Sequence, residues 1–437
     1  MTRIRKTLAP LLLSGLYLAI LCSAGYLMDQ PWTGAGLGLI SHRDPPACSA
    51  WRRVNEGGFG LPANAGEAEE TLPYQGEDGF EVLVYRDRLY VGMEADNRFG
   101  ARLWRTRAGV RSPAGQSDWE EVIADDAGRP WGLEDPSLVD HVDSLAEYDG
   151  HLYVSSASTG ESGGARVFRS ASGDPGSWED VLEGIGPGFG DPNNANFNDM
   201  VIFDGRLCGG TRNEVDGAEV WCTDGTTWER KNTPGFGEPG VRIAWSSAVF
   251  AGKLYLGVET VPADGSDGRS AGVYRTGSLA GAPEWEPVFA GDPFSFWAAL
   301  LGSVDGWLYM ATPGRDGIRI YRSATGDPDS WIPASVPGLA NSRFNTTTVP
   351  DGAVLYRDTL FVSVRNPLLG FRVWRLRGDD FWEVVPETST YDPNDIAAQL
   401  IVFNDALFAW TTNYHTGQAV LHSSCAELPY ISIDGEN

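Results

Sequence analysis

Four acidic residues occupy matching positions in successive segments of the chain. When the segments are aligned, Glu81 and Asp199 share one level, and Asp143 and Asp351 share the level just before it. Carboxylates that gather at one place bind a hard cation such as Ca²⁺ through oxygen. They also raise one another's pKa and can then act as an acid–base pair. Trp245 lies at the level of Asp143, where its ring offers a face to a sugar.

A simpler interpretation competes with each of these. Carboxylates at the mouth of an acidic protein are often only solvated, and aromatic residues such as Trp245 and Trp297 are more often core residues. We therefore take Glu81, Asp143, Asp199, Asp351 and Trp245 as candidate ligand-binding residues and assign no catalytic residue. HExxH, CxxCH and P-loop motifs are absent from the sequence, and no GxSxG string stands at a strand-to-helix turn, as a nucleophile elbow requires. A zinc site, a c-type haem or a nucleophile elbow is therefore not expected, and Ca²⁺ stays the one candidate metal.

The candidate residues belong to a sequence unit that is repeated along the chain. A leucine followed by an aromatic residue recurs along the chain, with Leu207-Cys208 in the third place. The other members are Leu89-Tyr90, Leu152-Tyr153, Leu254-Tyr255, Leu308-Tyr309, Leu360-Phe361 and Leu407-Phe408. A two-residue turn, often Asp-Gly, precedes each pair and predicts a hairpin. Each unit of about fifty residues then holds four antiparallel strands, as in propeller blades.

A tryptophan closes six of the units, at Trp119, Trp178, Trp228, Trp285, Trp331 and Trp382. The seventh unit has none, but Trp51 with Gly57 to Gly60 matches Trp228 with Pro234 to Gly237. We therefore predict an all-β, seven-bladed β-propeller of four-stranded antiparallel blades, whose last blade is closed by the N-terminal strand. Six or eight blades, or an array of β-sandwiches, are the alternatives. The propeller is a single domain over residues 47–425, and we expect a monomeric ring.

The N-terminal segment predicts that the protein is exported. Arg3, Arg5 and Lys6 precede an apolar, uncharged stretch from Leu8 to Met28. Residues 1–28 are either a signal peptide, cleaved after Ala24, or an N-terminal membrane anchor. Residues 29–46 read as a linker and residues 426–437 as a C-terminal tail. The expected location is the periplasm, the cell surface or the extracellular space.

Export permits disulfides, and four cysteines remain after residue 24. Cys48 lies before the Trp51 strand and Cys425 after the last strand, so both fall in the seventh blade. We predict a Cys48–Cys425 bond that clasps the ring. Cys208 and Cys222 face each other across a hairpin of the third blade, which predicts a second bond. Four buried free thiols are the alternative.

The turn before the closing tryptophan carries a resemblance to a known family. Thr223-Asp224-Gly225-Thr226-Thr227-Trp228 resembles the Asp-box repeat of sialidase-type propellers, and the segments 170–178 and 323–331 are looser versions. This likeness implies a propeller in which the boxes are structural turns. The Phe-Arg-Ile-Pro motif and the arginine triad of sialidases are not found. Arginines recur instead after an aromatic residue of the third strand, and we expect structural contacts from Arg105, Arg169, Arg275, Arg322 and Arg375.

The net charge limits the classes of partner that the protein can bind. The chain has 33 Lys and Arg against 59 Asp and Glu, a formal net charge of −26. This balance excludes nucleic acid as a partner and argues against docking on an anionic membrane surface. We expect an exported, non-enzymatic propeller that binds a protein partner or a surface glycan, with a cation at the axial mouth as an option. The alternative is a sialidase-like or other carbohydrate-active enzyme that uses the mouth carboxylates.

Overall fold

The computed structural model divides the chain into two compact units, Met1–Arg43 and Asp44–Asn437. It describes residues 47–48, 50–61, 79–95, 100–125, 127–158, 163–262, 268–340, 344–349, 352–378, 380–385 and 392–426, all in the second unit. The predicted signal or anchor segment and nearly all of the linker and tail lie outside these residues, so the domain boundaries stay a prediction. Among the described residues, no helix is long and apolar enough to cross a membrane.

The described strands form five four-stranded sheets, one eight-stranded sheet made of two four-stranded halves, and one two-stranded sheet. We call the seven four-stranded units blades 1 to 7. Blades 1 to 3 are β3 (Gly79–Tyr85), β4 (Arg88–Met93), β5 (Arg102–Thr106), β6 (Trp119–Glu121); β7 (Val142–Tyr148), β8 (His151–Ser156), β9 (Arg166–Ser170), β10 (Glu179–Asp180); and β11 (Asn194–Phe203), β12 (Arg206–Asn213), β13 (Val220–Thr223), β14 (Trp228–Arg230).

The remaining blades repeat this order. They are β15 (Val241–Phe250), β16 (Lys253–Thr260), β17 (Ser270–Thr276), β18 (Glu286–Ala290); β19 (Ala299–Val304), β20 (Trp307–Thr312), β21 (Arg319–Ser323), β22 (Ile332–Pro333); β23 (Ala353–Tyr356), β24 (Thr359–Val364), β25 (Arg372–Arg377), β26 (Phe381–Val384); and β27 (Ala397–Phe403), β28 (Ala406–Thr412), β29 (Val420–Ser423) with β2 (Arg52–Arg53). The N-terminal strand β2 pairs β29, as predicted from the Trp51 segment.

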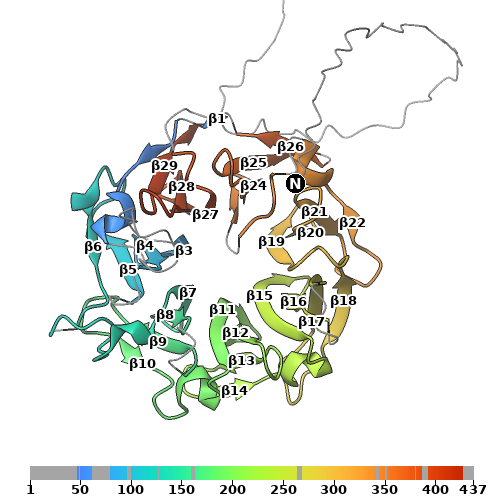
Figure 1. Ribbon diagram of the computed structural model, residues 1–437, viewed down its shortest axis with the longest axis horizontal. Coiled ribbons are helices and arrows are strands. Elements are labelled where there is room, and N and C mark those ends of the chain that lie inside the picture. The colour runs from blue at the N-terminus through green and yellow to red at the C-terminus, as the bar shows by residue number, and fades with distance from the viewer. Residues whose placement is uncertain are drawn as a thin grey trace, which may run out of the picture. The chain divides into compact units, whose positions relative to one another are not determined.

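The blades stand in a closed ring (Figure 1). The first strand of each blade contacts the first strand of the next, and β27 of blade 7 contacts β3 of blade 1. Closing the ring buries both faces of every blade, which a single four-stranded sheet cannot do. The core lies between blades: Tyr85 and Leu103 of blade 1, for example, pack with Val154 and Phe168 of blade 2. The predicted all-β propeller class is confirmed.

The turn between the first two strands has the same form in every blade. Both central residues have positive φ, as type I′ hairpin turns require. In Arg86-Asp87, for example, the φ angles are 48° and 59°, and in Asp149-Gly150 they are 47° and 72°. Asp, Asn and Gly reach this region at low cost, which explains why they recur at this place in the sequence.

Four of the closing tryptophans tie their blade to the one before it. The indole Nε1 of Trp119 donates to the carbonyl of Val54 at 2.9 Å, across the junction between blades 1 and 7. Trp178, Trp285 and Trp382 make the equivalent bonds to Val122, Lys231 and Ala334. A buried N–H needs a partner, so each of these bonds fixes one blade against its neighbour.

Arg105, Arg169, Arg275 and Arg322 each contact the next blade of the ring. Arg105 of blade 1 is buried, and its guanidinium lies 2.5 Å from the Asp174 carboxylate in the Asp-box-like turn of blade 2. Arg275 reaches Asp327 of the next blade at 2.7 Å, and Arg322 reaches Asp380 at 2.7 Å. These contacts are structural, as predicted.

The described residues also form six short 3₁₀ segments: η1 (Gly57–Gly60), η2 (Gln116–Asp118), η3 (Pro136–Leu138), η4 (Pro187–Gly190), η5 (Pro234–Gly237) and η6 (Pro337–Ala340). In three of them a phenylalanine stacks on an aromatic residue in the third strand of the following blade. Phe59 stacks on Trp104 with ring centroids 4.4 Å apart. Phe189 on Trp221 and Phe236 on Tyr274 are alike.

One predicted disulfide is confirmed. Cys208 and Cys222 are bonded, and they are direct partners across β12 and β13. This bond indicates an oxidising compartment. In the two-stranded sheet of β1 (Ala47–Cys48) and β30 (Cys425–Ala426), Cys48 lies opposite Cys425 and is itself disulfide-bonded. The Cys425 side chain lies outside the described residues, so the predicted Cys48–Cys425 bond stays a prediction.

Candidate functional site

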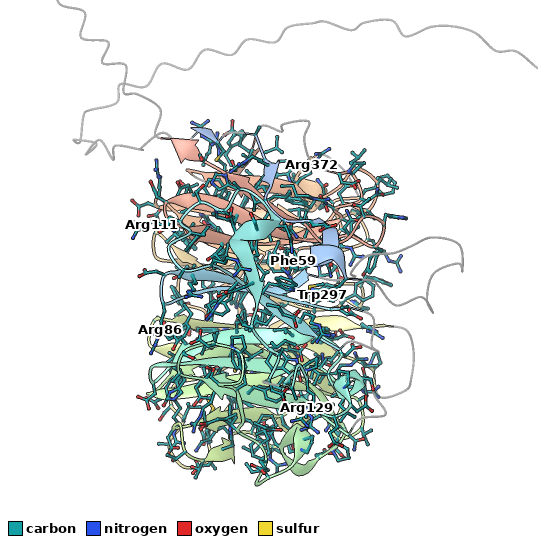
Figure 2. The ribbon with its side chains drawn as sticks, turned by 90° about the vertical axis from the view of Figure 1, so that its left-hand side faces the viewer. Phe59, Arg86, Arg111, Arg129, Trp297 and Arg372 are labelled. Atoms are coloured by element: carbon teal, nitrogen blue, oxygen red, sulfur yellow. A yellow bond between two sulfur atoms is a disulfide. The ribbon has the colours of Figure 1, made fainter. Side chains whose placement is uncertain are left out.

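A cavity of about 320 Å³ opens at the centre of the ring. Its walls come from the innermost strands and the loops beside them in all seven blades, and we call it the mouth cavity. The lining residues used below are Glu81, His141, Asp143, Asn196, Asp199, Trp245, Trp297, Arg365 and Gln399. The edge-on view shows Arg86, in the β3–β4 turn, at one face of the ring and Trp297 away from that face (Figure 2).

The structure gathers most of the residues chosen from the sequence. Glu81, Asp143, Asp199 and Trp245 all line the mouth cavity. Asp351 lies outside the described residues, so its place in the cavity stays a prediction. That these residues bind a ligand is likewise a prediction that their position alone does not test.

Both carboxylate oxygens of Asp143 accept hydrogen bonds from the protein. Its Oδ1 accepts from His141 Nε2 and from Asn196 Nδ2, both at 2.9 Å, and its Oδ2 accepts from the backbone N–H of Phe197 at 3.1 Å. The other ring nitrogen of His141 lies 3.0 Å from Asp140. Burial alone would lower the pKa of His141, but the adjacent Asp143 and Asp140 carboxylates raise it well above its ordinary value. The Asp140 and Asp143 carboxylates therefore favour the protonated form of His141.

Asp199 takes part in a repeated tie between neighbouring inner strands. At its level in the blade, one side-chain oxygen accepts the backbone N–H of the next inner strand. Ser144 accepts from Met200 at 2.8 Å, Asp199 accepts from Ser247, and Ser246 accepts from Leu300 at 3.0 Å. Asp199 thus accepts the same kind of hydrogen bond that a serine accepts in blades 2 and 4. At least one of its carboxylate oxygens is thus used to hold the ring.

The backbone at Asp199 is irregular. Its φ is 42°, in the left-handed region, and the β11–β12 register shifts between Asn198 and Val201. Aspartate tolerates this conformation better than most residues. A bulge redirects a side chain, and here it accompanies the bond from Asp199 to blade 4.

Two residues of the cavity wall have buried polar atoms without a hydrogen-bond partner among the described residues. Gln399 is 3% exposed, and its Oε1 has no partner. The Nε1–H of Trp297 is buried and has none either. The guanidinium of Arg365, which also lines the cavity, forms no ion pair with a described residue. A buried polar atom without a partner costs about 1–3 kcal/mol, so a ligand that satisfies these groups gains that amount of interaction.

Two tryptophans give the cavity an apolar side. The rings of Trp245 and Trp297 lie 6.0 Å apart between centroids, at an angle of 48°. Trp245 Nε1 donates to Glu259 at 3.2 Å, and Glu259 is in turn paired with Arg269 at 2.6 Å. The orientation of Trp245 is therefore fixed by a buried acceptor.

Within the described residues, no group of three or more His, Cys, Asp or Glu side chains is arranged to hold a metal ion. The carboxylate oxygens of Asp143 and Asp199 accept hydrogen bonds from the protein, so fewer of their lone pairs remain to bind a cation. Asp351 lies outside that description, so the predicted Ca²⁺ is carried forward only as a proposal.

Sequence reasoning missed three residues of this site. His141 was one of five scattered histidines with no metal-binding spacing, and its partners became visible only in space. Gln399 occupies the level of Glu81 and Asp199 in the repeat, so the alignment already held the signal for it. Arg365 lies outside the aligned inner strands, and no sequence signal pointed to it.

No protein-family model and no curated protein sequence matches the chain. Solved structures do resemble it. A polysaccharide lyase, Uly1, has a TM-score of 0.52 at 11% identity, over 87% of this chain and 99% of the lyase. The propeller domain of the trilobed protease from Pyrococcus furiosus has a TM-score of 0.47 at 9% identity, over 80% and 97%.

The Trypanosoma rangeli sialidase in complex with sialic acid has a TM-score of 0.42 at 10% identity. The match covers 87% of this chain but only 59% of the sialidase. At such low identities the likeness concerns the fold alone. The resemblance to propellers holds at that level, and no particular family is identified.

Proposed function

We propose that this protein is an exported, non-enzymatic propeller that binds a surface glycan in the mouth cavity. One observation carries the proposal: two tryptophan rings face a cavity whose wall also holds Arg365 and the unpartnered polar atoms of Gln399 and Trp297. Sugars present apolar ring faces and polar hydroxyl edges together, and this wall offers a surface for each. The volume of about 320 Å³ is at the low end for small-ligand sites.

The state of the carboxylates supports binding rather than hydrolysis. A general acid and its partner must be able to exchange protons with the substrate. Asp143 instead accepts three protein hydrogen bonds, one of them from His141, while Asp199 accepts a backbone N–H. Their positions are explained by ring structure, without a reaction.

A glycan array with the full-length protein, followed by isothermal titration of the strongest hits, tests the proposal. We expect binding without product formation, and Trp245→Ala lowers the affinity at least about tenfold by removing a stacking face. Trp307→Ala is the matched control, because Trp307 does not line the cavity. Cleavage of a bound glycan would instead establish the carbohydrate-active enzyme. Binding to a peptide library, with an empty glycan array, would establish a protein partner.

A mouth cation and an N-terminal anchor belong to the same proposal and need their own measurements. Calcium titration of the full-length protein, read by calorimetry, tests the cation. Fractionation of expressing cells, with N-terminal sequencing of the product, decides between a cleaved signal and an anchor in residues 1–28.

A further inference from the structure

The mouth cavity has a neighbour. A second hollow of about 350 Å³, which we call the side cleft, is lined by Phe296, Pro313, Thr346 and Thr347, among others. Trp297 and Arg365 line both the mouth cavity and the side cleft. The two hollows are therefore adjacent, and these two side chains form the boundary between them.

A line of aromatic rings runs from one hollow into the other. Trp245 lines the mouth cavity and Trp297 lies at the boundary, with 6.0 Å between the ring centroids. Phe296 lines the side cleft, and its centroid is 6.3 Å from that of Trp297. Each step is comparable to the length of one sugar ring in a linear chain. Three successive rings thus offer successive contact surfaces to such a chain.

Phe296 is held in an unfavourable position at the end of this line. It is 40% exposed, and its φ of 48° is an outlier for an aromatic residue. The preceding residue fixes the loop: Ser295 Oγ accepts the backbone N–H of Ala271 at 2.9 Å, and Ser295 N–H donates to Asp292 at 3.0 Å. Strained conformations that the surrounding structure enforces are concentrated at ligand-binding sites.

We propose that the site takes a linear oligosaccharide of at least two sugar units, which crosses Trp297 from the mouth cavity into the side cleft. One sugar lies against Trp245 and Trp297, and the next lies against Phe296. Arg365 has five N–H donors in a fixed plane and contacts hydroxyl groups on both sides of the boundary. This inference rests on the proposed glycan-binding function and adds the polymeric nature of the ligand.

The test measures affinity against chain length. Mono- to hexasaccharides of chitin, cellulose, xylan, mannan, alginate and polygalacturonate are titrated into the full-length protein. For the series that binds, we expect roughly a tenfold gain in affinity from the monosaccharide to the trisaccharide. Phe296→Ala removes this gain and leaves the monosaccharide affinity unchanged. Phe381→Ala, at a residue 62% exposed that lines neither hollow, leaves both affinities unchanged.

The outcomes separate this inference from the proposed function. If a monosaccharide binds as tightly as its trisaccharide and Phe296→Ala has no effect, the two-subsite inference is wrong while glycan binding stands. If no member of any series binds at any length, the proposed function itself fails. Because Phe296 is exposed, its variant should unfold at the same urea concentration as the wild type, and this is measured first.

Discussion

Replacing Asp395 with asparagine should stabilise the protein at neutral pH. Asp395 is 0% exposed and precedes β27, the strand that carries Gln399. Its Oδ1 accepts from Thr411 and Asn413, both at 2.8 Å, but its Oδ2 has no partner. Burial raises the pKa of Asp395 from 3.8 to about 6, although the two hydrogen bonds act in the opposite direction.

The repeat itself supplies the better residue. In blades 3 and 6 the equivalent positions are Asn194 and Asn345, whose Nδ2 groups donate to the carbonyls of Gly188 and Gly338. An aspartate cannot donate there once it is ionised. Asp395→Asn therefore restores the side chain that two other blades use.

The direction and magnitude of this stability change follow from the difference in the pKa of Asp395 between the folded and the unfolded protein. A carboxyl group whose pKa is higher in the folded than in the unfolded state stabilises the fold only while it is protonated. Its penalty therefore grows as the pH rises from 3.8 to about 6 and is complete above that range. A difference of about 2 units corresponds to at most ~3 kcal/mol. We expect Asp395→Asn to gain ~1–3 kcal/mol at pH 8, where the upper end requires a partner for the new amide N–H, and almost nothing at pH 4.

Urea unfolding, followed by tryptophan fluorescence at pH 4, 6 and 8, measures this difference. Asp392→Asn is the control with the opposite sign. Although burial opposes it, hydrogen bonds from Asn394 and Thr416 lower the pKa of Asp392. This variant should therefore lose stability at pH 6 and 8, keep most of that loss at pH 4, and recover only as the pH falls further below 3.8. An Asp395→Asn variant destabilised equally at pH 4 and pH 8 would refute the reasoning.

Three further substitutions test the contacts that join the ring, each by the shift in the free energy of unfolding. Arg105→Met removes the ion pair with Asp174 that joins blades 1 and 2, while Glu120 keeps its pair with Arg88, and it should cost ~2–3 kcal/mol. A cost under 0.5 kcal/mol would make the contact incidental. Trp119→Phe leaves the buried carbonyl of Val54 without its indole donor and should cost ~1–3 kcal/mol. Trp104→Phe should cost less, because the indole N–H of Trp104 already has no partner among the described residues. The double variant Cys208→Ala/Cys222→Ala removes a bond of sequence separation 14 and should cost ~3 kcal/mol; unchanged stability would contradict this.

The fold was readable from the sequence because its determinants are local and repeated. A type I′ turn needs two residues with positive φ, and the sequence shows Asp-Gly or a similar pair at each such place. The pairing of Cys208 with Cys222 followed from the same hairpin register. The closure by β2 followed from the likeness of the Trp51 segment to the Trp228 segment.

The site was readable only in part, because its chemistry depends on how neighbouring blades meet. The alignment placed Glu81, Asp143 and Asp199 at one end of the ring, and all three line the mouth cavity. It could not show that Asp143 faces His141, since that contact depends on the local path of the chain before β7. Arg365 follows β24, outside the aligned strands, so the repeat gave no reason to select it.

The acidic mouth is explained by the architecture before any chemistry is invoked. The bulged inner strands of a closed ring leave backbone N–H groups that need an acceptor from the neighbouring blade. Serine supplies it at Ser144 and Ser246, and aspartate supplies it at Asp199. A carboxylate at this level is thus interchangeable with a hydroxyl in its structural role, so its acidity alone is weak support for catalysis. The Oε1 atom of Gln399, at the same level, accepts no hydrogen bond from a described residue, so Gln399 is the residue of this level that most strongly points to a ligand.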